Sequence, residues 1–205
     1  MIVKVCGMRE ADNIRAVERA GADWMGFICY EGSKRYVATT PDYLPERSKR
    51  VGVFANASIE NIRERAHALR LDFLQLHGTE SPELCSTLHT EGYRLIKVFA
   101  LRSIADLKQI PPFAPYCDYL LFDTPCTSFG GSGKTFDWEL LRHYDGDTPF
   151  ILSGGIRPES LNELCRFRHP KWAGIDLNSG FETAPAVKDA ARLKTFIESI
   201  KKTSC

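Results

Sequence analysis

The chain has 205 residues, of which 43% are hydrophobic, and this length and composition are typical of one well-packed domain spanning residues 1–205. It carries 27 Lys and Arg against 26 Asp and Glu, so its formal net charge of +1 argues against nucleic acid as the main partner. Its longest apolar runs have the length of strands, which excludes a membrane-spanning helix, and MIVKVCGM at the N-terminus lacks the long apolar stretch of a signal peptide.

Short β-rich runs alternate with helical patterns along the whole chain. Eight runs are expected to form strands: 2–6, 24–29, 50–55, 73–77, 95–100, 119–123, 150–154 and 173–177. Helices are expected at 12–20, 58–69, 81–92, 103–110, 137–144, 158–167 and 187–202, with start signals at Ser58, Ser81, Ser103 and Asp137 and a stop at Gly92. The segment between the second and third strands has only a short helical piece near 41–48.

This alternation predicts parallel strands joined by right-handed crossovers, and therefore an α/β fold. Eight units in 205 residues give about 26 residues each, near the lower size limit of a (β/α)8 TIM barrel. A doubly wound open sheet would have five or six strands and a G-x-G-x-x-G turn after the first strand, where this chain has CGMR at 6–9. We therefore expect a small, closed, eight-stranded parallel barrel with its active site at the carboxyl ends of the strands.

The first strand ends in Cys6, whose thiol becomes a base or nucleophile once its pKa falls near neutrality. Because strand residues alternate between two faces, Lys4 shares a face with Cys6. If that face is the barrel interior, Lys4 needs a partner, and Asp176 on the eighth strand, which adjoins the first after closure, is the natural one. The alternative is that Cys6 only fills space in the core.

Three more side chains are placed at or near strand ends. Asp123 closes the sixth strand and is a candidate general acid or base; the alternatives are a cap, a loop-fixing hydrogen bond or a Walker B aspartate. Arg35, in GSKRY after the second strand, can reach the barrel mouth and pair with a carboxylate through two parallel hydrogen bonds, or it is simply solvated. His77 closes the fourth strand and is treated as a lining residue.

Glycines follow the last two strands, in the two places where a TIM barrel commonly holds phosphate. The seventh strand runs into Gly154 and Gly155, and the eighth runs into Asn178, Ser179 and Gly180. Such loops present backbone N–H groups to an anion. Together they favour a phosphorylated substrate, whereas either loop alone is ordinary.

The stretch GGSGKT at 130–135 resembles part of a nucleotide-binding P-loop. The leading glycine of the strict pattern is replaced by Ser128, and the next helix is expected to start at Asp137, too late for Lys134 to lie in its first turn. The match is therefore partial, and a loop over the barrel mouth is the better interpretation.

Seven cysteines lie at 6, 29, 85, 117, 126, 165 and 205. Their number is odd and no two have C-x-x-C spacing, so neither a disulfide framework nor a zinc site is expected, and a reduced, cytoplasmic setting is. The five histidines stand singly, with no metal-binding pattern.

Eight motifs run in order across nearly the whole chain. They are KVCGM at 4–8, GSKRY at 32–36, VGVF at 51–54, LQLHG at 74–78, LLFDT at 120–124, GGSGKTFDW at 130–138, LSGG at 152–155 and DLNSGFE at 176–182. Together they resemble the phosphoribosylanthranilate isomerases of tryptophan biosynthesis. KVCG combined with the GGSGKTFDW loop is the most specific part of this resemblance.

The resemblance implies a role for each matching residue. Cys6 would be the general base, Asp123 the general acid, and Arg35 the partner of the substrate's anthranilate carboxylate. The residues implied in phosphate binding are Gly154, Gly155, Ser179 and Gly180. Many family members read D-V-S-S-G where this chain reads D-L-N-S-G, so Asn178 is a substrate-binding candidate whose side chain has an open role.

The implied reaction is an Amadori rearrangement of an aminoaldose to an aminoketose. An acid protonates the furanose ring oxygen, and a base then removes the proton from C2′ of the resulting iminium ion. The resemblance further implies a small phosphorylated substrate and no metal or organic cofactor. A barrel of this size can be a monomer or a homodimer, and the glycines of the GGSGKT loop, which follows the sixth strand, would let it bend over the barrel mouth as a lid. Three rivals remain: another phosphate-binding TIM-barrel sugar-phosphate isomerase or epimerase, a nucleotide-hydrolysing enzyme built on GGSGKT, and a binding protein that has lost activity.

Overall fold

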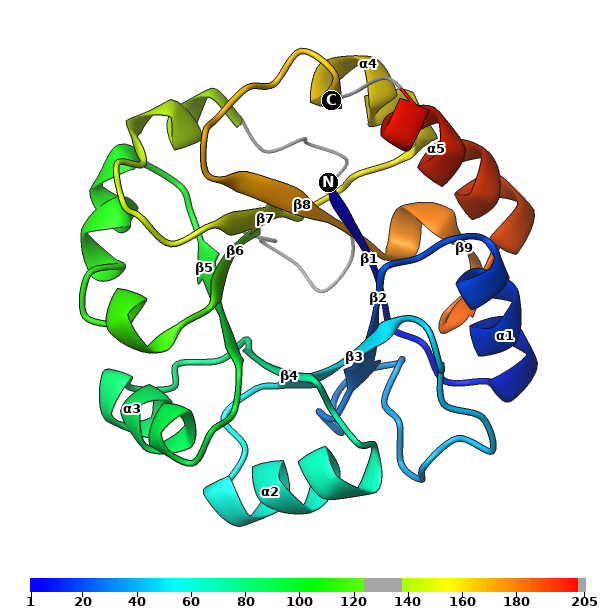
Figure 1. The fold of residues 1–205 in the computed structure, drawn as a ribbon, viewed down its shortest axis with the longest axis horizontal. Helices are drawn as coiled ribbons and strands as arrows, with labels where there is room; N and C mark the ends of the chain where they lie inside the picture. The colour runs from blue at the N-terminus through cyan, green and yellow to red at the C-terminus, as the bar shows by residue number, and fades with distance from the viewer. Residues whose placement is uncertain (124–137, 203–205) are drawn as a thin grey trace.

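The computed structural model describes residues 1–123 and 138–202, and its eight main strands form a closed parallel barrel (Figure 1). Each strand pairs with the next one along the chain, and β8 closes the ring on β1. The strands are β1 (Ile2–Cys6), β2 (Trp24–Ile28), β3 (Lys49–Phe54), β4 (Phe73–Leu76), β5 (Leu95–Ala100), β6 (Tyr119–Asp123), β7 (Phe150–Leu152) and β8 (Trp172–Leu177). The expected TIM barrel is therefore confirmed, with strand ends within two residues of those predicted.

Helices surround the ring of strands on its outside (Figure 1). The α-helices are α1 (Ala11–Arg19), α2 (Ile59–Ala68), α3 (Pro82–Thr90), α4 (Leu161–Leu164) and α5 (Ala190–Lys202). The 3₁₀ helices are η1 (Ile104–Gln109), η2 (Ala114–Tyr116), η3 (Trp138–His143), η4 (Pro158–Ser160) and η5 (Ser179–Phe181). Ser58 and Ser81 cap α2 and α3 as predicted, each accepting a hydrogen bond from a backbone N–H three residues later.

Several predicted helices differ from the observed ones. The segments 103–110 and 137–144 form only the 3₁₀ helices η1 and η3 within their described parts, and 158–167 divides into η4 and α4. The helical piece expected near 41–48 is wrong, since no helix forms there. The last helix begins at Ala190 instead of 187, because Val187–Lys188 forms a strand, β10, that pairs antiparallel with β9 (Glu182–Ala184).

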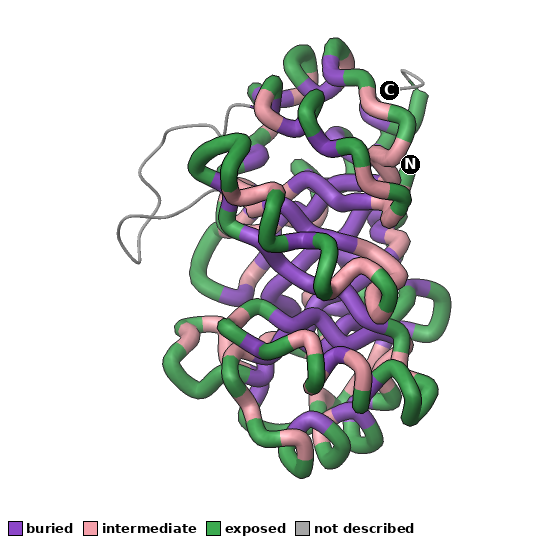
Figure 2. The backbone as a smooth tube through the Cα atoms, turned by 90° about the vertical axis from the view of Figure 1, so that its left-hand side faces the viewer, coloured by how far each residue is buried: buried purple, intermediate pink, exposed green. Residues whose placement is uncertain are grey.

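Two hydrophobic clusters hold the barrel together, and Figure 2 shows the buried strands at the centre of the molecule with exposed turns around them. The larger cluster joins the outer faces of the strands to the helices. The smaller one includes Trp24, Phe73 and Leu121. Trp24 lies opposite Lys4 in the register of β1 and β2, so this cluster is on the same side of the sheet as Lys4, inside the barrel.

Four of the five cysteines in the described residues are free thiols. Cys6, Cys29, Cys85 and Cys117 are unpaired, whereas Cys165 is disulfide-bonded, which the odd cysteine count and the lack of C-x-x-C spacing did not predict. Among the helices of the described residues, none has the length and apolar character needed to cross a membrane.

Candidate active site

Cys6 is the last residue of β1 and is only 4% exposed. It lies opposite Gly26 of β2, where an added methyl group would sit 2.6 Å from the sulfur. A glycine at this point of β2 therefore makes room for the thiol inside the barrel. The structure thus places Cys6 at the carboxyl end of a strand and on the interior face, as the alternation of residues predicted.

Lys4 and Asp176 form an ion pair with 2.8 Å between Nζ and Oδ1, and their side chains are 0% and 7% exposed. The two residues are direct register partners in β1 and β8. Burial lowers the pKa of Lys4, but the charges of Asp176 and Cys6 outweigh it, so the pKa stays above its ordinary value. The predicted partnership is confirmed, and it puts a fixed positive charge beneath Cys6.

The ionisation of Cys6 reflects competing effects. Burial raises the pKa of this thiol, Lys4 opposes the rise by its charge and a hydrogen bond, Asp176 adds to it, and Lys188 opposes it. The net result is a pKa above the ordinary thiol value, so the free protein holds Cys6 mainly as a thiol at neutral pH.

Asp123 ends β6 on the interior face and is 24% exposed. Its Oδ2 lies 3.5 Å from Nε2 of His77, the residue that follows β4. The other ring nitrogen of His77, Nδ1, lies 3.5 Å from the amide nitrogen of the buried Gln75. The charge of Asp123 also acts on Asp176, so the two carboxyl groups face the same space. His77 is therefore a neighbour of the candidate acid, which its treatment as lining understated.

Arg35 is held by Glu182 of β9. Its Nε and Nη2 donate to the two carboxylate oxygens at 2.8 and 2.6 Å, a bidentate arrangement. Lys188 of β10 donates to the same carboxylate at 2.6 Å and to Oδ1 of Asn178 at 2.7 Å. The side chain of Asn178, an open question in the sequence, is thus engaged with Lys188.

The loops after β7 and β8 meet one another. Gly154 and Gly155 have φ values of +87° and +68°, a conformation that glycine adopts without strain. A methyl group at Gly180 would lie 2.3 Å from the carbonyl oxygen of Ile156, so the second loop packs directly on the first. In η5 the first intrahelical bond runs from Phe181 N to Asn178 O, which leaves the N–H groups of Ser179 and Gly180 ahead of it.

The GGSGKT stretch, with the lid function expected of it, and the helix start signal at Asp137 fall outside the described residues.

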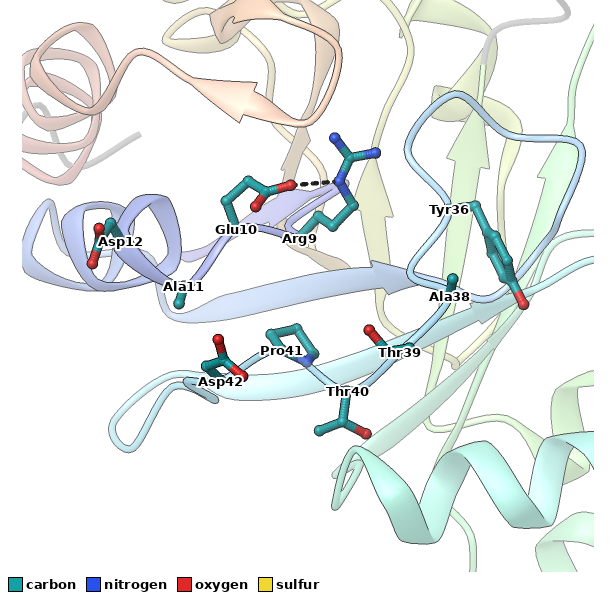
Figure 3. A pocket seen from close by; sticks show the side chains of 10 residues that line it. All are labelled: Arg9, Glu10, Ala11, Asp12, Tyr36, Ala38, Thr39, Thr40, Pro41 and Asp42. Atoms are coloured by element: carbon teal, nitrogen blue, oxygen red, sulfur yellow. Dashed lines mark hydrogen bonds and ion pairs between the residues drawn. The ribbon is translucent and has the colours of Figure 1, made fainter.

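A groove of about 510 Å³ lies away from the candidate site, between the start of α1 and residues 38–42. Figure 3 shows Arg9 paired with Glu10 on its wall. None of the candidate residues lines that groove. Within residues 1–123 and 138–202, no group of three His, Cys, Asp or Glu side chains is placed to hold a metal ion.

Sequence reasoning singled out neither Glu182 nor Lys188, although both side chains are nearly buried and Lys188 interacts electrostatically with Cys6. Glu182 appeared only as the last residue of the motif DLNSGFE. Lys188 was assigned to a predicted helix, in which a lysine is normally expected to face solvent. The signal that was available is the cluster of polar residues directly after the eighth strand, at the end of the barrel that carries the site.

Comparison with known proteins gives a consistent result. The sequence profile of the N-(5'-phosphoribosyl)anthranilate (PRA) isomerase family matches residues 3–199. The chain is 57% identical to the N-(5'-phosphoribosyl)anthranilate isomerase of Phocaeicola vulgatus, covering 98% of each chain.

Two solved structures superpose over nearly the full length. One is a phosphoribosyl anthranilate isomerase in complex with reduced 1-(o-carboxyphenylamino)-1-deoxyribulose 5-phosphate, with a TM-score of 0.83, 31% identity and coverage of 98% of this chain and 100% of the other. The other derives from the dimeric enzyme of Thermotoga maritima, with a TM-score of 0.82, 31% identity and the same coverage.

Proposed function

The chain belongs to the N-(5'-phosphoribosyl)anthranilate isomerase family of tryptophan biosynthesis, and from this premise we propose that Cys6 and Asp123 are its catalytic base and acid. The reaction converts N-(5'-phosphoribosyl)anthranilate to 1-(2-carboxyphenylamino)-1-deoxyribulose 5-phosphate. One observation carries the proposal: Cys6 and Asp123 end two well-separated strands, and both face the barrel interior at its carboxyl end. A substrate held between them meets both groups.

Asp123 acts first in this proposal. Its protonated carboxyl donates a proton to the furanose ring oxygen, the C1′–O bond breaks, and an iminium ion forms between C1′ and the anthranilate nitrogen. His77, 3.5 Å from the carboxylate, restricts its orientation. Positioned general acid catalysis of this kind contributes about 10²–10⁴-fold to the rate.

Cys6 acts second. The thiol first loses its proton to water, and the resulting thiolate removes the proton from C2′. The electron pair of that C–H bond forms the C1′=C2′ double bond while the π electrons of the C=N bond move to nitrogen, and the resulting enolamine tautomerises to the ketose. The raised pKa of the free thiol fits this order of events, because the iminium ion brings positive charge close to the sulfur. Lys4 already lies beneath it as a second positive charge.

Arg35 is proposed to bind the anthranilate carboxylate. Two of its five N–H groups are used by Glu182, which leaves three for the substrate. Glu182 thereby holds the guanidinium plane while the other edge remains available. This arrangement favours a positioned arginine over a freely moving one.

The phosphate is proposed to bind between the two glycine loops. Gly154, Gly155, Ser179 and Gly180 would contact it through backbone N–H groups. Asn178 contributes indirectly, since its side-chain oxygen accepts from Lys188. We further propose a single catalytic domain over residues 1–205 that is either a monomer or a homodimer, and light scattering of the purified protein distinguishes these.

The test of the assigned roles is substrate turnover. The purified protein is expected to consume N-(5'-phosphoribosyl)anthranilate, followed by the loss of its fluorescence, and Cys6→Ser and Asp123→Asn are each expected to lower kcat by about 10²-fold or more. Cys29→Ser is the matched control, because Cys29 is another buried free cysteine. Normal turnover in both active-site variants would refute the assignment. A panel of other sugar phosphates tests the rival barrel isomerases and epimerases.

A further inference from the structure

Lys188 is a buried lysine that the acid–base mechanism does not use. Asn13 of α1 clamps its backbone, accepting from its N–H at 2.9 Å and donating to its carbonyl at 2.8 Å. The side chain is 0% exposed, and its ammonium group donates to Glu182 and Asn178. Burial lowers the pKa of Lys188, and although the hydrogen bond and charge of Glu182 oppose that effect, the pKa stays below its ordinary value. The lysine is therefore fixed in one position at a cost in solvation.

Gly7 shows how close Lys188 lies to the candidate base. This residue follows Cys6, has a φ of +79°, and would bring an added methyl group within 2.7 Å of Arg35 Cδ, 3.0 Å of Asn178 Oδ1 and 3.4 Å of Lys188 Nζ. The ammonium group is thus packed against the backbone adjoining the thiol. Consistent with this, the charge of Lys188 lowers the pKa of Cys6 against the effect of burial.

The charges around Cys6 do not cancel. From β1 and β8, Lys4 and Asp176 form a neutral pair. From the loop after β2 and from β10, Arg35 and Lys188 bring two positive charges that share the single negative charge of Glu182. This cluster therefore has a formal net charge of +1. Arg35 alone already occupies both oxygens of Glu182, so pairing that carboxylate does not require a second cation.

We propose that Lys188 is a positioning residue for the base: a buried, fixed positive charge that stabilises the thiolate of Cys6, the form that removes the C2′ proton. The expected effect of Lys188 on the reaction rate rests on the proposed function, because it requires Cys6 to be the base. The expected effect on the ionisation of the thiol does not require that role. Asn13, Asn178 and Glu182 hold the ammonium group in place.

The test measures the ionisation of Cys6 directly. Iodoacetamide alkylation of Cys6 is followed against pH, with the modified peptide identified by mass so that the other thiols do not interfere. Lys188→Gln and Lys188→Met remove the charge, and glutamine retains hydrogen bonding to Asn178 and Glu182. Lys188→Arg retains the charge. Lys201→Met is the matched control, because it removes a lysine that pairs with Asp23 at the surface. Circular dichroism verifies that each variant is folded.

The alkylation midpoint is expected to rise by about one pH unit or more in Lys188→Gln and Lys188→Met, and to stay near the wild-type value in Lys188→Arg and Lys201→Met. The acidic limb of the kcat/KM profile, which reports the pKa of the base, is expected to move to higher pH with it, with about a tenfold fall at pH 7 for each unit. An unchanged midpoint in folded Lys188→Gln, or an equal rise in Lys188→Arg, overturns the inference. If Cys6→Ser retains turnover while the alkylation midpoint of Cys6 still rises in the Lys188 variants, Cys6 is not the base. The effect of Lys188 on the ionisation of the thiol then still stands.

Discussion

Lys4 and Asp176 are joined across the closure of the barrel, with 2.8 Å between ammonium and carboxylate and almost no exposure to solvent. Lys4 lies on the same face of β1 as Cys6, two residues before it, and Asp176 is its partner on β8. The same ion pair therefore joins β1 to β8 and places a positive charge next to the candidate base.

Removing one member of this pair is expected to lower the free energy of unfolding far more than removing both. Asp176→Leu alone leaves Lys4 charged and buried, which costs about 3–5 kcal/mol of the free energy of unfolding. The double variant with Lys4→Met removes both charges and is expected to recover most of that loss. Urea unfolding measures the difference, and Lys171→Met, which breaks an exposed pair with Asp147, should change little. Strictly additive losses would contradict a direct interaction.

Gly7→Ala is expected to damage both stability and catalysis. The left-handed backbone costs about 1–2 kcal/mol for alanine, and the new methyl group would also displace Arg35 and Asn178. Gly92→Ala is the matched control, since Gly92 has a φ of +89° with nothing within 4 Å of an added methyl group. Both variants should lose stability in urea, but only Gly7→Ala should raise KM and lower kcat. Unchanged kinetics in Gly7→Ala would refute the close packing around this loop.

Glu182 is expected to contribute an acid-sensitive part of the stability. Burial raises its pKa, but hydrogen bonds from Arg35 and Lys188 outweigh burial and leave the pKa below the ordinary value of 4.5. The native state therefore favours the ionised form, and the resulting stability is present above about pH 4.5 and is lost as the pH falls through the lower native value. The difference in unfolding free energy between the wild type and Glu182→Gln should shrink from pH 7 to pH 3. A constant difference for Glu182→Gln across this pH range would contradict the linkage.

His77→Asn is expected to lower kcat more than it changes KM. Its Nε2 lies 3.5 Å from the carboxylate of Asp123, so its loss frees the acid to rotate without removing it. The fall should be smaller than in Asp123→Asn. Steady-state kinetics of the two variants side by side decide this, and a kcat in His77→Asn equal to that of the wild type would make the histidine a lining residue only.

The fold and part of the site could be predicted because they depend on local patterns. Alternation along β1, together with the expected closure of the barrel onto β8, paired Lys4 with Asp176, and strand ends located Cys6 and Asp123. The short strand at Lys188 was missed because its conformation depends on hydrogen bonds to Asn13, 175 residues away in sequence. The 3₁₀ helices were missed because their sequences carry the same start signals as α-helices.

The assigned roles of Cys6 and Asp123 are tested most directly with substrate carrying deuterium at C2′. In Cys6→Ser, removal of that proton becomes slower, so the primary isotope effect on kcat is expected to rise above the wild-type value. In Asp123→Asn, ring opening becomes slower and precedes proton removal, so the isotope effect is expected to fall towards one. A fall of the isotope effect in Cys6→Ser together with a rise in Asp123→Asn, or the same isotope effect in both variants, would contradict the assignment of base and acid.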